Sequence, residues 1–336
     1  MTAGLPKGFT VRPVTMEELK AAVALFNACS MELIGAKQHD VDETRVEWGT
    51  PGFNLETDTR VVLSPAGEIV GYIEVWDIEE PHVQIWSWGR VRPDYRGKRI
   101  GTYLLQWAEA RARKAIPKTP SGARVVLRHS ALHQDKPAQA LLAHEGFNLI
   151  RHFWRMVIEM DGPPPTPVWS EGVVVRTFAP EQEDRALATA VRGMFKDHWG
   201  YVETPFEEEL VRWQHWLKND KNFDPSLWFL AMDGDEITGA SLCSPKTNED
   251  PDMGYVHTLG VRRPWRRHGI ALALLHHSFG EFLNRGKRKV SLHVDAKSLT
   301  GATRLYEKAG MHVDRLSHNY EKELRPGKDL ATQSVT

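Results

Sequence analysis

Several segments in the first half of this sequence reappear in the second half in the same order, so the chain must fold one plan twice. The matches recur roughly 165 positions later. Single matches arise easily by chance, whereas four matches with one order and nearly one spacing do not. The sequence therefore predicts two copies of one domain with small insertions and deletions. The matched pairs are Thr10–Val14 with Val174–Phe178, Gly67–Gly71 with Asp235–Gly239, Val91–Arg96 with Val261–Arg266, and Glu145–Phe147 with Ala309–Met311.

A proline-rich segment separates the two copies. Residues 161–170, DGPPPTPVWS, contain four prolines within five positions, and neither a helix nor a central strand tolerates such a run. We interpret this segment as an extended linker. We therefore expect one domain over residues 1–160 and a second over 171–326. Residues 327–336 are expected to form a polar, frayed tail.

Composition excludes several classes of function. The 336 residues are 41% hydrophobic, enough for two cores. Lys and Arg total 43 against 44 Asp and Glu, so there is no basic excess and we expect no nucleic-acid partner. No apolar run reaches about 18 residues and no signal peptide is evident, so we expect no membrane segment and a cytoplasmic location. Two distant cysteines, Cys29 and Cys243, predict neither disulfides nor a cysteine zinc site, and no metal is expected.

The hydrophobic pattern predicts a domain of mixed α and β structure in each half. In the second half Gly234 marks a hairpin, and Gly286 marks the end of a long helix. Residues 311–324 predict two short final strands, around Met311 and Tyr320. The expected strands are Val173–Phe178, Trp228–Asp233, Glu236–Cys243, Tyr255–Val261 and Val290–Val294, and the expected helices are Gly101–Ala115, Ala138–His144, Pro180–Phe195, Ile270–Leu283 and Thr300–Lys308.

One segment has the pattern of a phosphate-binding site. Residues 259–271, LGVRRPWRRHGIA, read as a strand, a turn, a basic glycine-containing loop and the start of an apolar helix. A helix start presents unpaired N–H groups and the positive end of its dipole. A glycine there lets the backbone approach an anion closely, which suits a pyrophosphate. The alternative is a basic loop that only caps an ordinary helix.

The same segment resembles the GNAT superfamily of N-acetyltransferases, whose acyl-CoA motif is Arg/Gln-x-x-Gly-x-Gly/Ala. Arg266, Gly269 and Ala271 stand at its defining positions, and Thr300–Met311 strengthens the likeness. The resemblance covers both halves, essentially residues 9–160 and 171–325. It implies two tandem GNAT domains of the α/β class, each a twisted mixed β-sheet flanked by helices. A tandem pair is similar to the mycothiol synthase-like members of the superfamily.

The resemblance implies direct transfer of an acetyl group from acetyl-CoA to a primary amine on a small molecule or peptide. The strand that ends in Leu259–Val261 would pair with the pantetheine, and one of its N–H groups would polarise the thioester carbonyl. The N–H groups of residues 267–271 would hold the pyrophosphate. Serine stands where relatives often carry an asparagine that contacts CoA. The implied cofactor-binding residues are Leu259, Gly260, Val261, Arg266, Arg267, His268, Gly269, Ile270, Ala271 and Ser298.

Two residues are the catalytic candidates. Tyr306 stands where the family carries the tyrosine that protonates the departing CoA thiolate, and its alternative is a packed aromatic side chain. Relatives tend to carry a glutamate at the position of Tyr255. His257, two residues further on, is our candidate base because an imidazole titrates near neutral pH. Its alternative is a hydrogen-bonded structural residue. The region from Asp197 to Tyr201 is expected to line the acceptor site.

The first copy departs from the motif. Arg99 stands at the position of Gly269, and Leu142 at that of Tyr306. We therefore expect a degenerate first domain that is structural or binds CoA weakly, and catalysis in the second. Two alternatives stay open: a mycothiol synthase-like enzyme, against which the missing glutamate counts, and an inactive acyl-CoA-binding scaffold. The sequence identifies neither the acceptor nor the oligomeric state.

Overall fold

The computed structural model describes residues 4–334 and contains two compact units. The first unit comprises the chain up to Arg151 together with 218–220 and Ser317–Leu330. The second unit comprises His152–Leu217, Lys221–Leu316 and the residues from Ala331 onward. No helix within residues 4–334 is long and apolar enough to span a membrane.

Each unit contains a six-stranded sheet, and the two sheets have the same strand order. The order is β1-β2-β3-β4-β5-β12 in the first unit and β7-β8-β9-β10-β11-β6 in the second. In each sheet one pair is parallel, β4 with β5 and β10 with β11. The strands are β1 Thr10–Arg12, β2 Thr59–Leu63, β3 Ile69–Trp76, β4 Gln84–Val91, β5 Val125–Leu132, β6 Asn148–Glu159, β7 Val173–Thr177, β8 Trp228–Asp233, β9 Glu236–Ser244, β10 Met253–Val261, β11 Lys289–Asp295 and β12 His312–Arg325.

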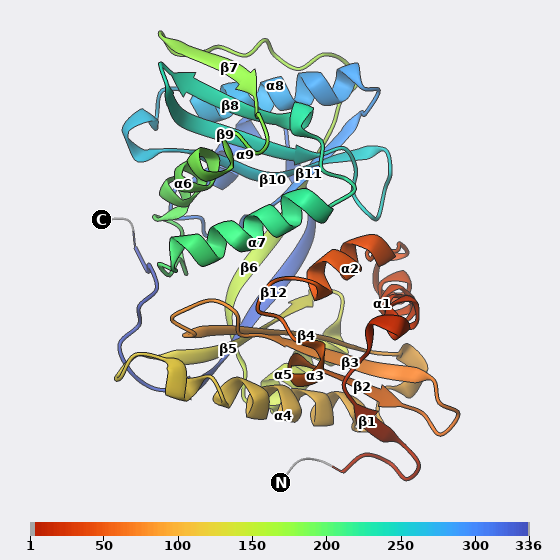
Figure 1. Ribbon diagram of the computed structural model, residues 1–336. Coiled ribbons are helices and arrows are strands. Elements are labelled where there is room, and N and C mark those ends of the chain that lie inside the picture. Colours follow the sequence, from red (N-terminus) through yellow and green to blue (C-terminus); the bar gives the residue numbers. More distant parts are fainter. Residues whose placement is uncertain (1–3, 335–336) are drawn as a thin grey trace. The chain divides into compact units, whose positions relative to one another are not determined.

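Helices cover both faces of each sheet. In the first unit α4 lies along one face, while α1 and α2 lie on the other (Figure 1). In the second unit α8 covers one face, and α6 and α7 lie on the other (Figure 1). The predicted mixed sheets flanked by helices are thus confirmed. The helices are α1 Leu19–Ile34, α2 Val41–Trp48, α3 Leu55–Asp58, α4 Ile100–Arg113, α5 Lys136–His144, α6 Asp184–Phe195, α7 Phe206–Asn219, α8 Ile270–Asn284 and α9 Ala302–Lys308.

The repeat extends to individual hydrogen bonds. The Arg92 N–H donates to the Val70 carbonyl at 2.9 Å, and the Arg262 N–H donates to the Thr238 carbonyl at 2.8 Å. These bonds fix the same turn after the same strand in each copy. Near the start of each copy an arginine also pairs with a glutamate, Arg12 with Glu18 and Arg176 with Glu183.

The two copies exchange their last strands, so the units differ from the boundaries expected at residues 160 and 171. Most of β6, which ends the first copy, belongs to the second unit and pairs antiparallel with β11. Most of β12, which ends the second copy, pairs antiparallel with β5 in the first unit (Figure 1). Sequence periodicity cannot reveal this exchange, because each strand has the same pattern whichever sheet it completes.

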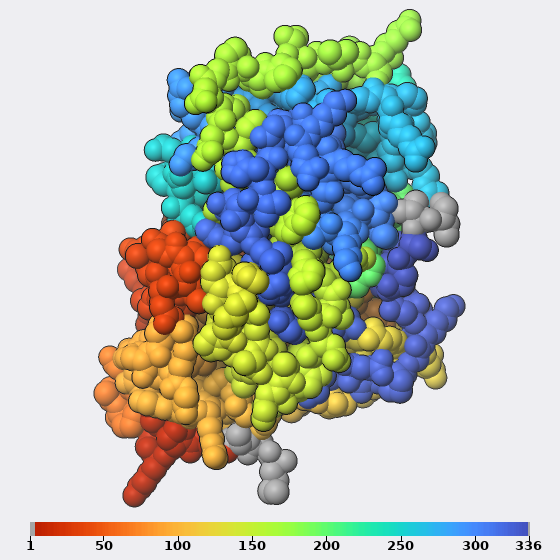
Figure 2. Space-filling model, turned by 180° about the vertical axis from the view of Figure 1, so that it is seen from behind, coloured from red at the N-terminus to blue at the C-terminus, as the bar shows by residue number. Residues whose placement is uncertain are grey.

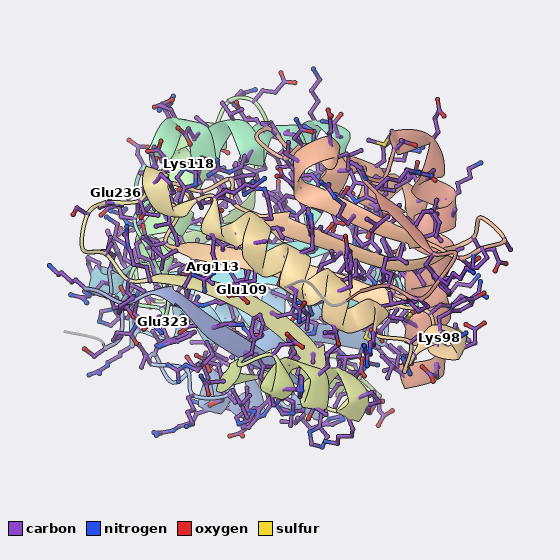
Figure 3. The ribbon with its side chains drawn as sticks, turned by 90° about the horizontal axis from the view of Figure 1, so that it is seen from below. Lys98, Glu109, Arg113, Lys118, Glu236 and Glu323 are labelled. Atoms are coloured by element: carbon purple, nitrogen blue, oxygen red, sulfur yellow. The ribbon has the colours of Figure 1, made fainter. Side chains whose placement is uncertain are left out.

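Buried side chains anchor the exchanged strands. Met156 of β6 lies in the core of the second unit, and Tyr320 and Leu324 of β12 lie in the core of the first. Glu109, which lies along α4 with Arg113 (Figure 3), forms ion pairs with Arg113 at 2.7 Å and with Lys322 of β12 at 2.5 Å.

Two expectations for the end of the chain were wrong. The predicted two short strands over residues 311–324 are one long strand, β12, which spans His312–Arg325. Residues 327–334 are held by hydrogen bonds and are not frayed. The Arg124 N–H donates to the Lys328 carbonyl at 2.8 Å in the first unit, and the Thr332 N–H donates to the Tyr201 carbonyl at 2.9 Å in the second. The linker around residues 161–170 runs over the surface, as the yellow-green chain in Figure 2 shows.

The exchange predicts where two core substitutions act. Leu324→Ala should lower the free energy of unfolding by about 2–5 kcal/mol and loosen the first unit, and Met156→Ala should do the same in the second. Hydrogen exchange should show protection lost in β4 and β5 for Leu324→Ala, and in β10 and β11 for Met156→Ala. Protection lost in β10 and β11 for Leu324→Ala, or in β4 and β5 for Met156→Ala, would contradict the exchange of strands.

Candidate active site

The site begins where two parallel strands of the second unit part. The β10–β11 pairing starts at Met253 and Lys289 and ends at Val256 and Leu292. Beyond this point both strands continue without pairing to each other. On its other side β10 pairs with β9, and there the register shifts between Val256 and Thr258. His257 is therefore the extra residue of a β-bulge, a device that re-aims side chains.

A cavity of about 260 Å³ lies in this opening. β10 contributes His257 and Leu259, and β11 contributes His293 and Asp295. α9 contributes Tyr306. The two sequence-predicted catalytic residues thus lie in one pocket, although 49 positions separate them in the chain.

Tyr306 has the environment of a proton donor. Its side chain is buried, and its hydroxyl has no hydrogen-bond partner among residues 4–334. Burial, together with nearby Tyr255, raises the pKa of Tyr306 to about 12. The phenol therefore stays protonated at neutral pH and can donate to a group that enters the pocket.

His257 is held by a neighbour that sequence reasoning missed. Its Nε2 lies 2.6 Å from the Ser244 hydroxyl. The imidazole is open to the pocket, but the protein packed around it desolvates the charged form and lowers the pKa of His257 to about 4. The ring is thus neutral at pH 7. Ser244 ends β9, and no sequence signal connects it with His257.

A second histidine in the pocket was also missed. Nδ1 of His293 lies 2.8 Å from the Tyr255 hydroxyl, and the Tyr255 ring packs edge-on against His257, with centroids 4.5 Å apart. Tyr255 thus lies between two imidazoles, at the position where relatives tend to carry a glutamate. His293 follows directly after Leu292, the last residue of β11 that pairs with β10, and no sequence signal identifies it.

The motif glycine shapes the turn before α8. Gly269 caps the helix with φ 81°, a left-handed conformation that favours glycine. A Cβ atom at this position would meet nothing within 4 Å, so the space next to the turn is open. No side chain caps α8, which leaves its first N–H groups, those of Ile270 and Ala271 among them, directed at that space. This is the geometry expected for a pyrophosphate site.

The motif arginine, Arg266, binds groups of the protein itself and does not point to the open space where a phosphate would lie. The Arg266 guanidinium donates to the Val261 carbonyl and to the Met194 carbonyl, both at 3.0 Å, and pairs with Asp197. Its side chain therefore fastens the end of α6 to the end of β10. Gly260 permits this packing, because a Cβ there would lie 2.9 Å from the Met194 side chain.

The remaining predicted cofactor residues lie around the same turn. Arg267 adopts φ 67°, and the His268 carbonyl accepts a 2.6 Å hydrogen bond from Ser170 of the linker. Ser298 lines the pocket, but its hydroxyl accepts a 3.4 Å bond from the Ala302 N–H at the start of α9 and lies 3.1 Å from the Thr300 hydroxyl.

Aromatic side chains form the outer wall of the pocket. Phe195, His198 and Trp199 line it, so part of the region from Asp197 to Tyr201 lies at the pocket, and its contact with the acceptor stays a prediction. Phe153 of the exchanged strand β6 lines it as well. Thr332 braces this wall: its carbonyl accepts from the Gly200 N–H at 2.8 Å. Within residues 4–334 no group of three or more His, Cys, Asp or Glu side chains is arranged to hold a metal.

The first unit has a matching opening with different side chains. The β4–β5 pairing ends at Ser87 and His129, and a cavity of about 340 Å³ follows. The β3–β4 pairing contains no register shift, so this unit lacks the bulge. Arg99 adopts φ 64° and caps α4 as Gly269 caps α8, so the turn keeps its conformation despite the arginine.

The sequence is similar to known proteins along most of its length. A family model described as "Acetyltransferase (GNAT) family" matches residues 22–147 and 189–311. The mycothiol acetyltransferase of Thermobispora bispora is 30% identical over 256 residues, which cover 74% of this chain and 79% of that protein. The mycothiol acetyltransferase of Streptomyces coelicolor is 26% identical over 328 residues, covering 95% and 97%.

Solved structures give the same result for the fold. A GCN5-related N-acetyltransferase from Sphaerobacter thermophilus superposes with a TM-score of 0.78 at 36% identity, over 97% of this chain and 99% of that chain. A tandem GNAT protein from the clavulanic acid biosynthesis pathway superposes with a TM-score of 0.70 at 17% identity, over 95% and 100%. The tandem fold predicted from the internal repeat is thus confirmed.

The turn geometry predicts the effect of Gly269→Arg. Because Arg99 already occupies the matching position with the same backbone conformation, the variant should keep its fold and its circular dichroism spectrum. The arginine would fill the open space at the start of α8, so the affinity of the second unit for acetyl-CoA, measured by native mass spectrometry, should fall at least about tenfold.

Gly286→Arg is the matched control, because Gly286 has φ 78° and open surroundings at the other end of α8. It should leave acetyl-CoA binding unchanged. An equal loss in both variants, or none in Gly269→Arg, would contradict a pyrophosphate at this turn.

Proposed function

The chain belongs to the acetyltransferase (GNAT) family, and from this we propose that it transfers an acetyl group from acetyl-CoA to a primary amine, with the chemistry in its second unit. The observation that carries the proposal is the shared pocket of Tyr306 and His257, at the opening between β10 and β11. An amine and a thioester must meet at such a point, and a proton donor must be within reach of the departing sulfur.

The first unit has neither a tyrosine at the position equivalent to Tyr306 nor a histidine at the position equivalent to His257. Just after α5, the Phe147 N–H donates to the Leu142 carbonyl at 2.9 Å. Just after α9, the Met311 N–H donates to the Tyr306 carbonyl at 3.0 Å. Leu142 and Tyr306 are thus equivalent by structure as well as by sequence. Ser87 lies as many residues before the end of β4 as His257 lies before the end of β10, so these two positions are equivalent as well. Leucine cannot protonate a thiolate, which supports assigning turnover to the second unit.

In the proposed reaction the amine nitrogen attacks the thioester carbonyl carbon, and a C–N bond forms. Main-chain N–H groups of β10 beyond its last bond to β11 stabilise the negative oxygen. Neutral His257 accepts a proton from the nitrogen, which becomes acidic once the bond has formed. The C–S bond then breaks, and the Tyr306 hydroxyl protonates the departing sulfur. Acid and base return to their starting states through solvent.

The pocket wall bears on the acceptor. A mycothiol-type acceptor, the amine of a cysteinyl pseudo-disaccharide, is the second candidate, favoured by the name of the relatives in Thermobispora and Streptomyces. Tyr255 in place of a glutamate, and the wall of Phe153, Phe195 and Trp199, favour a less polar amine. Turnover with a panel of amines that includes both kinds would separate the two, and turnover with none would favour an inactive acyl-CoA-binding scaffold.

Tyr306→Phe tests the acid. The substitution removes one hydroxyl that has no partner among the described residues, so Tm should be nearly unchanged while kcat falls roughly 10²- to 10⁴-fold. Tyr103→Phe on α4 of the first unit is the matched control and should keep full activity. Undiminished kcat in Tyr306→Phe would exclude its role as the acid.

His257→Gln tests the base. With its pKa at about 4, the imidazole should stay neutral down to about pH 5, and its NMR signal, identified by its loss in the variant, should not titrate above that pH. kcat should fall by about two orders of magnitude. His312→Gln, at an exposed position of β12, is the control. A signal that titrates near pH 6.5 would contradict the desolvated environment, and an unchanged kcat would make His257 structural.

A further inference from the structure

The cavity of the first unit is lined by an arginine that forms no ion pair within residues 4–334. The cavity, of about 340 Å³, extends from the opening between β4 and β5 to the turn at the start of α4, and Arg90, Arg96 and Arg99 line it. Arg90 is the next-to-last residue of β4, at the position that Gly260 occupies in the second unit.

Arg90 is positioned but not paired. Its Nη1 donates to the carbonyl of neighbouring Gly89 at 2.9 Å, and its guanidinium stacks over Trp88 at 4.3 Å. Its Nε is buried without a hydrogen-bond partner, and Nη2 likewise has none among residues 4–334. Nε and Nη2 form one edge of the guanidinium, and their two parallel N–H groups match the two oxygens of a carboxylate.

The acidic groups nearest to Arg90 are used elsewhere. The Asp135 carboxylate accepts from the Ala138 N–H at 3.0 Å, and Glu74 accepts from the Tyr72 hydroxyl at 2.6 Å. Arg96 does have a partner, because it pairs with Glu32 at 2.6 Å. Asp135 is the only acidic residue among those that line the cavity, against three arginines.

This arrangement costs folding free energy. Burial lowers the pKa of Arg90, because desolvation penalises its charged form more than distant carboxylates stabilise it. An arginine nevertheless stays charged at neutral pH, and a buried donor without a partner is destabilising. A carboxylate placed at this edge would supply the missing hydrogen-bond partners and offset that cost.

We propose that the cavity of the first unit is a binding site for a ligand with a terminal carboxylate, which the Nε–Nη2 edge of Arg90 holds. The ligand class is an acyl-CoA whose acyl group ends in a carboxylate, or the free dicarboxylate itself. The cavity reaches the α4 turn, whose backbone conformation matches the α8 turn, and apolar Ile73, Leu104 and Leu141 line the space between. This site is independent of the activity proposed for the second unit.

The experiment compares succinyl-CoA, acetyl-CoA and free succinate on the wild-type chain and on Arg90→Gln, by isothermal titration and native mass spectrometry. Succinyl-CoA should bind the wild type at a site whose affinity falls at least about tenfold in Arg90→Gln, because two charge-assisted hydrogen bonds are lost. Acetyl-CoA affinity should change less than about twofold. Arg90→Lys keeps the charge but loses the two parallel N–H groups, so its affinity for succinyl-CoA should lie between those of the wild type and Arg90→Gln.

Arg60→Gln is the matched control. Arg60 also stacks on a tryptophan of the first unit, Trp107, at 4.6 Å, but lies outside the cavity and donates to main-chain carbonyls. It should leave succinyl-CoA affinity unchanged. Free succinate bound with the same dependence on Arg90 would support the carboxylate site and identify the free acid as its ligand.

Three results would overturn the proposal. The first is equal succinyl-CoA affinity in the wild type and Arg90→Gln. The second is no binding of either succinyl-CoA or succinate by the wild type. The third is a drop of several degrees in the Tm of ligand-free Arg90→Gln, which would make the arginine a structural residue. An unchanged or raised Tm, with the ligand-induced rise in Tm lost, is the expected result.

Discussion

Parallel strands β10 and β11 bond to each other only as far as Val256 and Leu292, and the second unit is organised around their parting. Main-chain N–H and C=O groups beyond that point need partners, because leaving them buried and unpaired is costly. An extended ligand can supply those partners. The bulge at His257 lies at the last paired residue, and α9 directs Tyr306 into the same opening. The binding surface and the catalytic candidates thus depend on one interrupted ladder.

Two residues of the motif before α8, Gly269 and Arg266, have different roles. Gly269 keeps the space above the helix start open, whereas Arg266 faces the protein and joins α6 to β10 through Met194, Val261 and Asp197. Hydrogen bonds from Arg263, and to a smaller extent from Arg266, lower the pKa of Asp197, so its carboxylate stays charged at neutral pH. The same arginine that marks the family in sequence therefore positions the wall from Phe195 to Trp199, on which the acceptor would lie.

The two units keep one backbone plan and differ in the side chains that carry chemistry. The opening between the parallel strands, the turn before the long helix and the C-terminal hydrogen bond of the short helix each occur once in either unit. Leu142 replaces Tyr306, and Arg90 replaces Gly260. These changes remove the phenol of Tyr306 from the first cavity and add the guanidinium on which the proposed binding site rests. Exchange of β6 and β12 makes each copy necessary to the other's sheet, which gives a physical reason for the first unit to persist whatever it binds.

The sequence by itself determined the repeat, the mixed sheets, the hairpin at Gly234 and the turn at Gly269, because these depend on local periodicity and on residues with restricted backbone angles. It also selected Tyr306 and His257, since both stand at fixed distances from recognisable glycines. Only the tertiary structure decided the exchange of β6 and β12, the roles of Ser244 and His293, and the internal use of Arg266. Those features depend on which segments meet in space, and a strand's pattern of buried residues does not encode its partner.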